Sequence, residues 1–280
     1  MLRNITVSFP GLGIENFDLD NVAFKIGESF EVMWYGVVIA LGMLMAIGYA
    51  AYRCKQSGIS VDDLTDIAIF TILFGVIGAR LYYVAFSPNQ FKTIWDVLNL
   101  RSGGLAIYGG IIAGALTVFV CCLIKKISWR KLFDCVGPGV MIAQAMGRWG
   151  NFFNGEAFGG LVQEGHPLYF LRMGLISRNT YGDFGTSSMV YVHPTFLYES
   201  LWNVLGFVLI NIVFKKKKFD GQNALYYFAW YGFGRMFIEG LRTDALFIGD
   251  TGIRVSQLLG FLLFAVATAL IVYGLIYVKN

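Results

Sequence analysis

Charged residues are scarce in this sequence. Asp, Glu, Lys and Arg make up 14% of its 280 residues and 56% are hydrophobic, whereas soluble domains carry about 25% charged residues. This deficit excludes a wholly water-soluble protein. Apolar runs instead recur along the whole chain, each close to the roughly 20 residues that a helix needs to cross a bilayer. The composition therefore predicts one polytopic integral membrane protein.

The motifs of several enzyme classes are missing as well. The sequence has no GxSxG elbow, no HExxH and no Walker loop. It therefore lacks the catalytic motifs of α/β-hydrolases, zinc proteases and P-loop NTPases. Its four cysteines show neither CxxC spacing nor a nearby histidine cluster, and we interpret them as buried small apolar side chains. We therefore expect no metal and no cofactor.

The N-terminal segment lacks the features of a secretory signal. Residues 1–20 have no basic start, no continuous apolar stretch and no small-residue cleavage site. We expect them to form a retained arm. The net charge of +4 resides mainly in short connectors between apolar runs and not on an aromatic-studded soluble face, so we expect no nucleic-acid partner.

Seven apolar windows predict an all-α bundle of about seven transmembrane helices. The connectors after the first, third and fifth windows are basic, with Arg53 and Lys55, the cluster at 125–131 and the run 215–218. Basic connectors face the cytoplasm, which places the N-terminus outside and the C-terminus inside. The windows are residues 32–52, 64–86, 105–124, 132–150, 196–214, 222–241 and 255–278.

This topology predicts a simple domain organisation. Residues 1–31 form an extracytoplasmic arm, and residues 32–280 form the transmembrane domain. The longest polar stretch within that domain, 155–193, follows the fourth window and is expected to form a small cap on the outer face.

Six ionisable residues fall inside these windows or at their ends, where a charge costs several kcal/mol unless it is paired or hydrated. They come from four segments, and all fall toward the outer face, which predicts one polar cavity there. Two interpretations are open: the cations pair with the anions to hold helices together, or arginines bind a phosphate, whose geometry guanidinium matches. A membrane-embedded phosphate belongs to a phospholipid. The six are Arg80, Arg148, Glu156, Glu199, Arg235 and Glu239.

Three motifs carry most of these residues. In GRWGNFFNGEAFGG (147–160), Arg148, Asn151 and Gly155 share one helical face. In WYGFGRMFIEGLRTD (230–244), polar residues recur every three or four positions and form one stripe. In HPTFLYE (193–199), Pro194 suits a helix start, and His193 is either a cap at the interface or a functional group.

These three motifs, together with MWYG (33–36) and GGLAIYGGIIAG (103–114), resemble those of the phosphatidylglycerol:prolipoprotein diacylglyceryl transferase family. The resemblance extends from about residue 30 to the C-terminus. It implies a seven-helix enzyme of the bacterial plasma membrane that transfers the diacylglyceryl group of phosphatidylglycerol to the lipobox cysteine of a prolipoprotein signal peptide. A thioether forms and glycerol phosphate leaves. The implied partners are that lipid, that signal peptide and the bilayer.

The resemblance also implies the site residues. The expected catalytic residues are Arg148, Arg235, Tyr108, Glu156 and Asn151. The expected substrate-binding residues are Tyr35, Arg80, Asn154, Gly159, His193, Glu199, Tyr231, Glu239 and Arg242.

One position departs from the family pattern. Where well-known members read His-Gly-Gly, this chain reads Tyr108-Gly109-Gly110. Tyrosine, with a pKa of about 10, is a poor base at neutral pH. The general base is therefore open among Tyr108, Glu156, His193 and a solvent-assisted thiolate.

The nucleophile is expected to be the thiol of the substrate, with Arg148 and Arg235 holding the lipid phosphate as the thiolate displaces it. Two other classes of function remain open. In a channel or transporter, the arginines would select an anion. In a lipid-binding protein, there would be binding without turnover.

Overall fold

The computed structural model describes residues 5–27, 30–87, 90–91, 93–100, 103–249 and 251–279. Residues 1–4 and 28–29 of the expected arm lie outside this described part. The chain divides into two compact units. The larger unit comprises Met1–Ala46 and Gly137–Asn280, and the smaller unit is Ile47–Val136.

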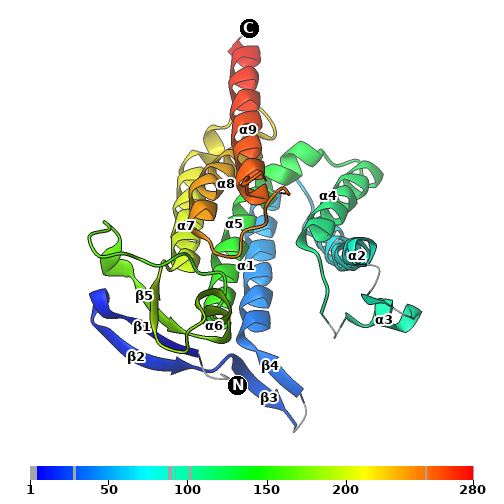
Figure 1. Cartoon of the computed structure of the whole chain (residues 1–280). Coiled ribbons are helices and arrows are strands. Elements are labelled where there is room, and N and C mark those ends of the chain that lie inside the picture. The colour runs from blue at the N-terminus through cyan, green and yellow to red at the C-terminus, as the bar shows by residue number, and fades with distance from the viewer. Residues whose placement is uncertain are drawn as a thin grey trace. The chain divides into compact units, whose positions relative to one another are not determined.

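Each apolar window predicted from the sequence contains one long helix (Figure 1). Five of these helices are long and apolar enough to cross a membrane among the described residues, and the protein is mostly helical. The helices α5 and α8 are not among the five, because charged, amide and aromatic side chains lower their hydropathy. The long helices are α1 (Trp34–Gln56), α2 (Val61–Phe86), α4 (Ile107–Ile124), α5 (Trp129–Phe153), α7 (Thr195–Val213), α8 (Gln222–Leu241) and α9 (Val255–Lys279).

The larger unit also contains a four-stranded antiparallel sheet (Figure 1). Its order is β2-β1-β5-β6, so the N-terminal strands pair with strands from the stretch 155–193. The expectation of an all-α protein is wrong for these segments, because strands of three to six residues are set by partners distant in sequence and not by a local pattern. The strands are β1 (Ile5–Phe9), β2 (Ile14–Leu19), β5 (Met173–Ile176) and β6 (Val190–Val192).

A hydrophobic core joins this sheet to the helices of the larger unit. Val7, Leu175 and Val192 are almost fully buried, and they cluster with Phe152 of α5 and Phe196 of α7. The sheet therefore packs on the C-terminal end of α5 and the N-terminal end of α7, which bear the polar motifs. A short helix, α6 (Arg178–Phe184), follows β5, and a hairpin of β3 (Val22–Ile26) and β4 (Phe30–Met33) leads into α1.

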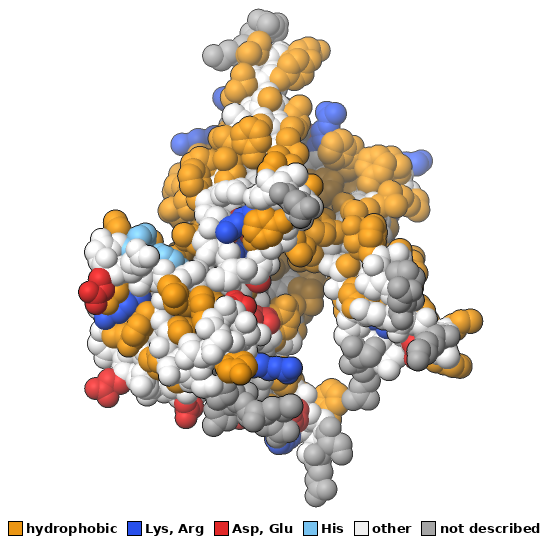
Figure 2. Space-filling model, viewed as in Figure 1, with side chains coloured by type: hydrophobic (Ala, Val, Ile, Leu, Met, Phe, Trp, Pro, Cys, Tyr) orange, Lys and Arg blue, Asp and Glu red, His pale blue; other side chains and the backbone are white. Residues whose placement is uncertain are grey.

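Helices within the larger unit approach closely at glycines. A Cβ on Gly232 of α8 would lie 2.5 Å from the Gly260 carbonyl oxygen of α9, so only glycine fits at this crossing. Figure 2 shows hydrophobic side chains covering α7 and α9, whereas acidic side chains are seen mainly over the strands.

The smaller unit is built on the crossing of α2 and α4. Gly78 and Gly109 bring the two backbones together, since a Cβ on either glycine would overlap the carbonyl oxygen of the other. Lys125, just after α4, lies 2.7 Å from both Asp63 and Asp66 of α2. A short helix, α3 (Ile94–Leu98), lies between the two long helices in sequence. The four cysteines are free. Three of them are buried, as predicted, whereas Cys121 is only partly buried.

Candidate active site

Three helices of the larger unit contribute to one buried ion cluster. Arg148 of α5 places its Nε 2.6 Å from Oε2 of Glu199 on α7. Arg235 of α8 donates from Nη1 to Oε1 of the same carboxylate at 2.7 Å. The Glu199 side chain is 5% exposed, and a carboxylate so buried requires charged partners. Both arginines therefore converge on one point. We call these three residues, together with Glu239 and Arg242, the arginine centre.

The other two members complete the cluster. Glu239 lies one turn after Arg235 on α8, and its Oε2 forms an ion pair with Arg235 Nη2 at 2.5 Å. Arg242, at the end of α8, places Nη1 3.6 Å from Glu199 and pairs with Asp244 through two hydrogen bonds of 2.8 and 2.7 Å. Burial opposes ionisation of Asp244, but the hydrogen bond and charge of Arg242 keep its pKa below the usual value. Asp244 was not predicted from the sequence, although it follows Arg242 closely in the motif.

An amide chain extends from Arg148 to Glu156. Asn151 accepts a hydrogen bond from Arg148 Nη1 at 3.2 Å and donates to Glu156 Oε1 at 3.1 Å. Asn154 donates to the same oxygen at 3.1 Å. Gly155, with a φ of +57°, allows the sharp turn after α5 that returns Glu156 toward the helix. Two amides thus fix the orientation of this carboxylate.

Gly159 brings the third motif into contact with the end of α8. Its N–H donates to the His193 carbonyl at 2.9 Å, and it forms an antiparallel bridge with Arg242. A Cβ there would lie 2.7 Å from His193 Cβ and 2.9 Å from the Leu241 carbonyl oxygen. Because glycine has no side chain, the backbone at residue 159 can lie against both His193 and the end of α8.

The two predicted tyrosines of the larger unit lie beside the charged motifs. Tyr35 at the start of α1 packs its ring on Gly150, where a Cβ would be 2.9 Å from Tyr35 Cδ2. Tyr231 lies one turn before Arg235 on α8, and its ring stacks on Tyr227 with centroids 6.1 Å apart.

Two predicted site residues belong to the smaller unit. Arg80, buried in α2, donates five hydrogen bonds to backbone carbonyls of residues 96–104. These bonds satisfy the guanidinium and tie the end of α3 and the carbonyls of Asn99, Gly103 and Gly104 to α2. Tyr108 lies half-buried in the first turn of α4. Of the six ionisable residues predicted to share one cavity, Arg148, Glu199, Arg235 and Glu239 form the ion cluster of the larger unit, whereas the Arg80 hydrogen bonds lie within the smaller unit.

The two histidines of the sequence lie together in the larger unit. The rings of His166 and His193 meet edge to face with centroids 5.0 Å apart, and His193 Nδ1 lies 3.3 Å from the Tyr198 hydroxyl. Burial lowers the pKa of His193, and the charge of His166 lowers it further. His166 was missed by sequence reasoning, because it lies in a loop without periodic pattern.

The arrangement is suited to binding an anion. The Arg148 side chain is 22% exposed, compared with 12% for Arg235 and 11% for Arg242. Within the described part of the chain, its Nη2 makes no hydrogen bond. Arg148 therefore has a donor available to an incoming oxyanion. No group of three or more His, Cys, Asp or Glu side chains among the described residues could hold a metal ion.

Comparison with known proteins agrees with the motifs. Residues 21–273 match the family model described as prolipoprotein diacylglyceryl transferase. The chain is 42% identical to the phosphatidylglycerol--prolipoprotein diacylglyceryl transferase of Clostridium kluyveri over 91% of this chain and 96% of the relative. Identity to the enzyme of the same name is 42% in Listeria innocua, covering 91% of this chain and 90% of the relative.

A third relative gives the same result. The phosphatidylglycerol--prolipoprotein diacylglyceryl transferase of Staphylococcus aureus is 39% identical over 94% of this chain and 91% of its own length. Since these matches cover nearly the whole chain, the resemblance seen in the motifs is confirmed. The chain belongs to the prolipoprotein diacylglyceryl transferase family, and it is a transferase.

Proposed function

We propose that this protein transfers the diacylglyceryl group of phosphatidylglycerol to the lipobox cysteine thiol of bacterial prolipoproteins. Its named relatives and the family match support this reaction. The observation that carries the proposal is the convergence of Arg148 and Arg235 on one point in a buried site. Two fixed guanidiniums can hold the phosphate of the lipid while a sulfur atom replaces it.

In this reaction the substrate thiolate attacks the glycerol carbon that bears the phosphate. The S–C bond forms, the C–O bond breaks, and the electron pair of that bond leaves with glycerol phosphate. The arginines stabilise the charge that develops on the phosphate. Glu199 occupies the position between the two guanidiniums, so the lipid phosphate binds first at the Nη2 of Arg148, and Arg235 adds positive charge beside it. Arg242 adds positive charge at the end of α8.

The thiol proton needs an acceptor. A lipobox thiol with a pKa of about 8.5 is already a few per cent thiolate at pH 7. Within the larger unit, two groups can take the remaining proton: Glu156, whose second carboxylate oxygen is not engaged by the amides, and His193, which its lowered pKa keeps neutral. Tyr108 remains a candidate from the smaller unit, and the solvent-assisted route remains the fourth.

The other predicted residues have binding and positioning roles in this scheme. Asn151 and Asn154 orient Glu156, and Glu239 orients Arg235. Gly159 permits the contact of His193 with the end of α8. Tyr35 and Tyr231 line the lipid head group, and Arg80 retains the substrate-binding role that the motifs imply.

We place the protein in the bacterial plasma membrane with seven spans, so that α5 and α8 also cross it. The basic residues at the end of α1, after α4 and after α7 support a cytoplasmic location for those ends. The N-terminus then lies outside and the C-terminus inside, with the active site toward the outer leaflet. The arm 1–31 and the stretch 155–193 form the extracytoplasmic cap on the transmembrane domain 32–280.

One experiment tests this function directly. Purified protein is incubated with phosphatidylglycerol and a lipobox peptide, and the products are analysed by mass spectrometry. We expect the peptide mass to rise by one diacylglyceryl group and glycerol phosphate to appear. A peptide with serine in place of the lipobox cysteine serves as control and stays unmodified. An unmodified cysteine peptide, with the lipid consumed or bound unchanged, would contradict the proposal.

A further inference from the structure

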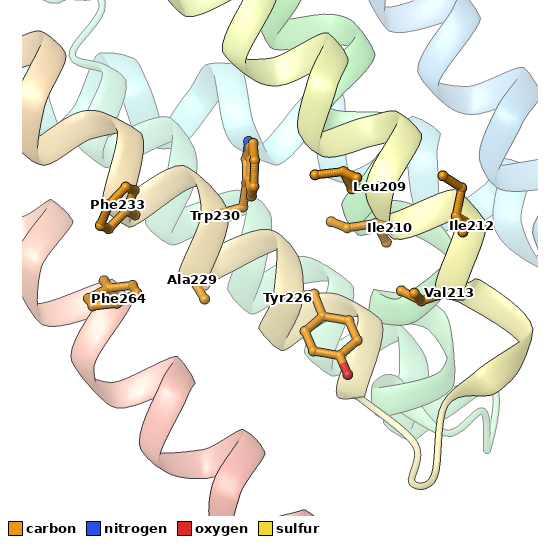
Figure 3. A pocket seen from close by; sticks show the side chains of 9 residues that line it. All are labelled: Leu209, Ile210, Ile212, Val213, Tyr226, Ala229, Trp230, Phe233 and Phe264. Carbon is orange, nitrogen blue, oxygen red and sulfur yellow. The ribbon is translucent and has the colours of Figure 1, made fainter.

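An apolar cavity lies on the larger unit, between the C-terminal half of α7, the N-terminal half of α8, and α9. It forms a groove of about 570 Å³ (Figure 3), within the range of small-ligand sites. The lining is aliphatic and aromatic, and the Trp230 indole N–H is already donated to the Trp202 carbonyl at 2.9 Å. The lining residues are Leu209, Ile210, Ile212, Val213, Tyr226, Ala229, Trp230, Phe233 and Phe264.

This groove is separate from the arginine centre. On α7 its lining begins about ten residues beyond Glu199, which is about 15 Å along the helix axis. On α8 it extends from Tyr226 to Phe233, before Arg235 and Glu239. None of its lining side chains takes part in the ion cluster described above. A molecule in the groove would therefore not occupy the site proposed for the transferred lipid.

One end of the groove is basic. Lys215 and Lys216 follow the lining residue Val213 and are exposed on the short helix η5 (Phe214–Lys216). Lys218 is also exposed. Lys217 differs from them, because it forms an ion pair with Asp220 at 2.9 Å. Three cationic side chains thus remain at the turn between α7 and α8.

A hydrogen-bonded chain connects this turn to the groove. The Lys218 backbone N–H donates to Gln222 Oε1 at 2.5 Å, and Gln222 Nε2 donates to the Tyr226 hydroxyl oxygen at 2.5 Å. Because the Tyr226 oxygen accepts this bond, its own proton remains available to another acceptor. Figure 3 shows the hydroxyl on the side of the groove toward the turn. The apolar groove thus ends at the Tyr226 hydroxyl, which can donate a hydrogen bond, and at the basic turn between α7 and α8.

We propose that this groove binds an anionic phospholipid at the opposite end of the helices from the arginine centre. One acyl chain lies along the apolar lining, and the phosphate lies at the Tyr226 hydroxyl and the exposed lysines. The apolar lining gives affinity for any acyl chain. The lysines select a head group with net negative charge, since each lysine near a membrane surface attracts anionic lipid.

The test measures lipid binding by native mass spectrometry on the purified full-length protein. The probes are phosphatidylserine, which is anionic, and phosphatidylcholine, which is zwitterionic, with identical acyl chains. We expect one phosphatidylserine to bind at least about tenfold more tightly than phosphatidylcholine. The triple variant Lys215→Gln, Lys216→Gln, Lys218→Gln should lose this preference and keep its phosphatidylcholine affinity. Its control, Lys55→Gln, Lys126→Gln, Arg130→Gln, removes the same charge elsewhere and should keep it.

Two further variants distinguish the groove from other sites. Ala229→Phe fills the groove and should weaken binding of both lipids about tenfold or more, whereas Ala269→Phe, at an exposed position of α9 outside the lining, should not. Arg148→Ala should leave the preference for phosphatidylserine unchanged. The proposal is overturned if the lysine variant keeps its preference, if Ala229→Phe binds like the wild type, or if Arg148→Ala abolishes the preference, since the bound lipid would then be at the arginine centre.

Discussion

Arg148 and Arg235 bind the two oxygens of a single buried carboxylate, although they come from different helices. Their contacts with Glu199 are 2.6 and 2.7 Å long. Arg235 also pairs with Glu239, and Arg242 pairs with Asp244, so the three arginines face three carboxylates. What distinguishes the arrangement is that the two guanidiniums meet at one shared carboxylate, while Arg148 Nη2 makes no hydrogen bond within the described part of the chain.

The first prediction concerns these two arginines. Arg148→Ala and Arg235→Ala should each lower kcat/KM for diacylglyceryl transfer by about 10²- to 10³-fold, because each removes a preorganised donor from a low-dielectric site. Initial rates with phosphatidylglycerol and a lipobox peptide measure the effect. Arg130→Ala, at the exposed N-terminal end of α5, is the matched control and should retain the wild-type rate. Wild-type rates in both site variants would eliminate the phosphate clamp.

Removing Glu199 should destabilise the protein. Glu199→Gln leaves two buried guanidiniums without their shared counter-charge, which costs about 3 to 5 kcal/mol of the free energy of unfolding. Thermal unfolding in detergent measures this loss. Glu31→Gln breaks the ion pair between Glu31 and Lys25, whose side chains are 51% and 60% exposed, respectively. This variant should lose at most about 1 kcal/mol of the free energy of unfolding. Equal losses in the two variants would show that Glu199 is not a structural counter-ion.

Two neighbouring glycines should respond differently to alanine. In Gly159→Ala the new Cβ meets His193 Cβ at 2.7 Å and the Leu241 carbonyl oxygen at 2.9 Å, so the segment must shift from the end of α8 that bears Arg242. We expect the transfer rate to fall at least about tenfold, since shifts of about 1 Å at a site have such effects. Gly160→Ala meets no atom within 4 Å and should be near neutral. The prediction is wrong if the two variants have the same rate.

His193 should contribute to the pH dependence of stability. Its folded-state pKa lies below the unfolded value of about 6.5, so the folded state binds fewer protons. The contribution of His193 to the free energy of unfolding is therefore fully present above about pH 6.5. It is lost as the pH falls through that value toward the lower folded-state pKa. The melting temperature of the wild type should fall more between pH 7.5 and 5.5 than that of His193→Gln. His166→Gln should reduce the fall only in part, because burial is the larger cause. Parallel profiles for wild type and His193→Gln would contradict this assignment.

The crossing of α2 and α4 should not tolerate a methyl group. Gly109→Ala would overlap Tyr82 Cβ and the Gly78 carbonyl, and such overpacking costs about 1 to 3 kcal/mol. Gly48→Ala, in α1, meets no atom within 4 Å and should leave stability unchanged or raise it slightly, since alanine favours helix. Thermal unfolding of both variants in the same detergent decides the point. A stable Gly109→Ala would mean that the two helices do not meet there.

The sequence by itself determined where the long helices lie. All seven apolar windows contain one, and the bounds agree within a few residues, because hydropathy over about 20 residues is a local property. It also supplied the arginines, glutamates and asparagines of the candidate site, since charged residues stand out in apolar segments. The motifs were specific enough to predict the family that the comparisons then confirmed.

Only the tertiary structure decided which groups meet. No local pattern shows that Arg148 and Arg235 share Glu199, that Arg80 is satisfied by backbone carbonyls, or that His166 contacts His193. The pairing of β1 with β5 was likewise invisible, because it joins segments more than 150 residues apart and each strand is too short to leave a reliable pattern. Such contacts depend on how the helices and the sheet pack together, and that is a property of the whole chain.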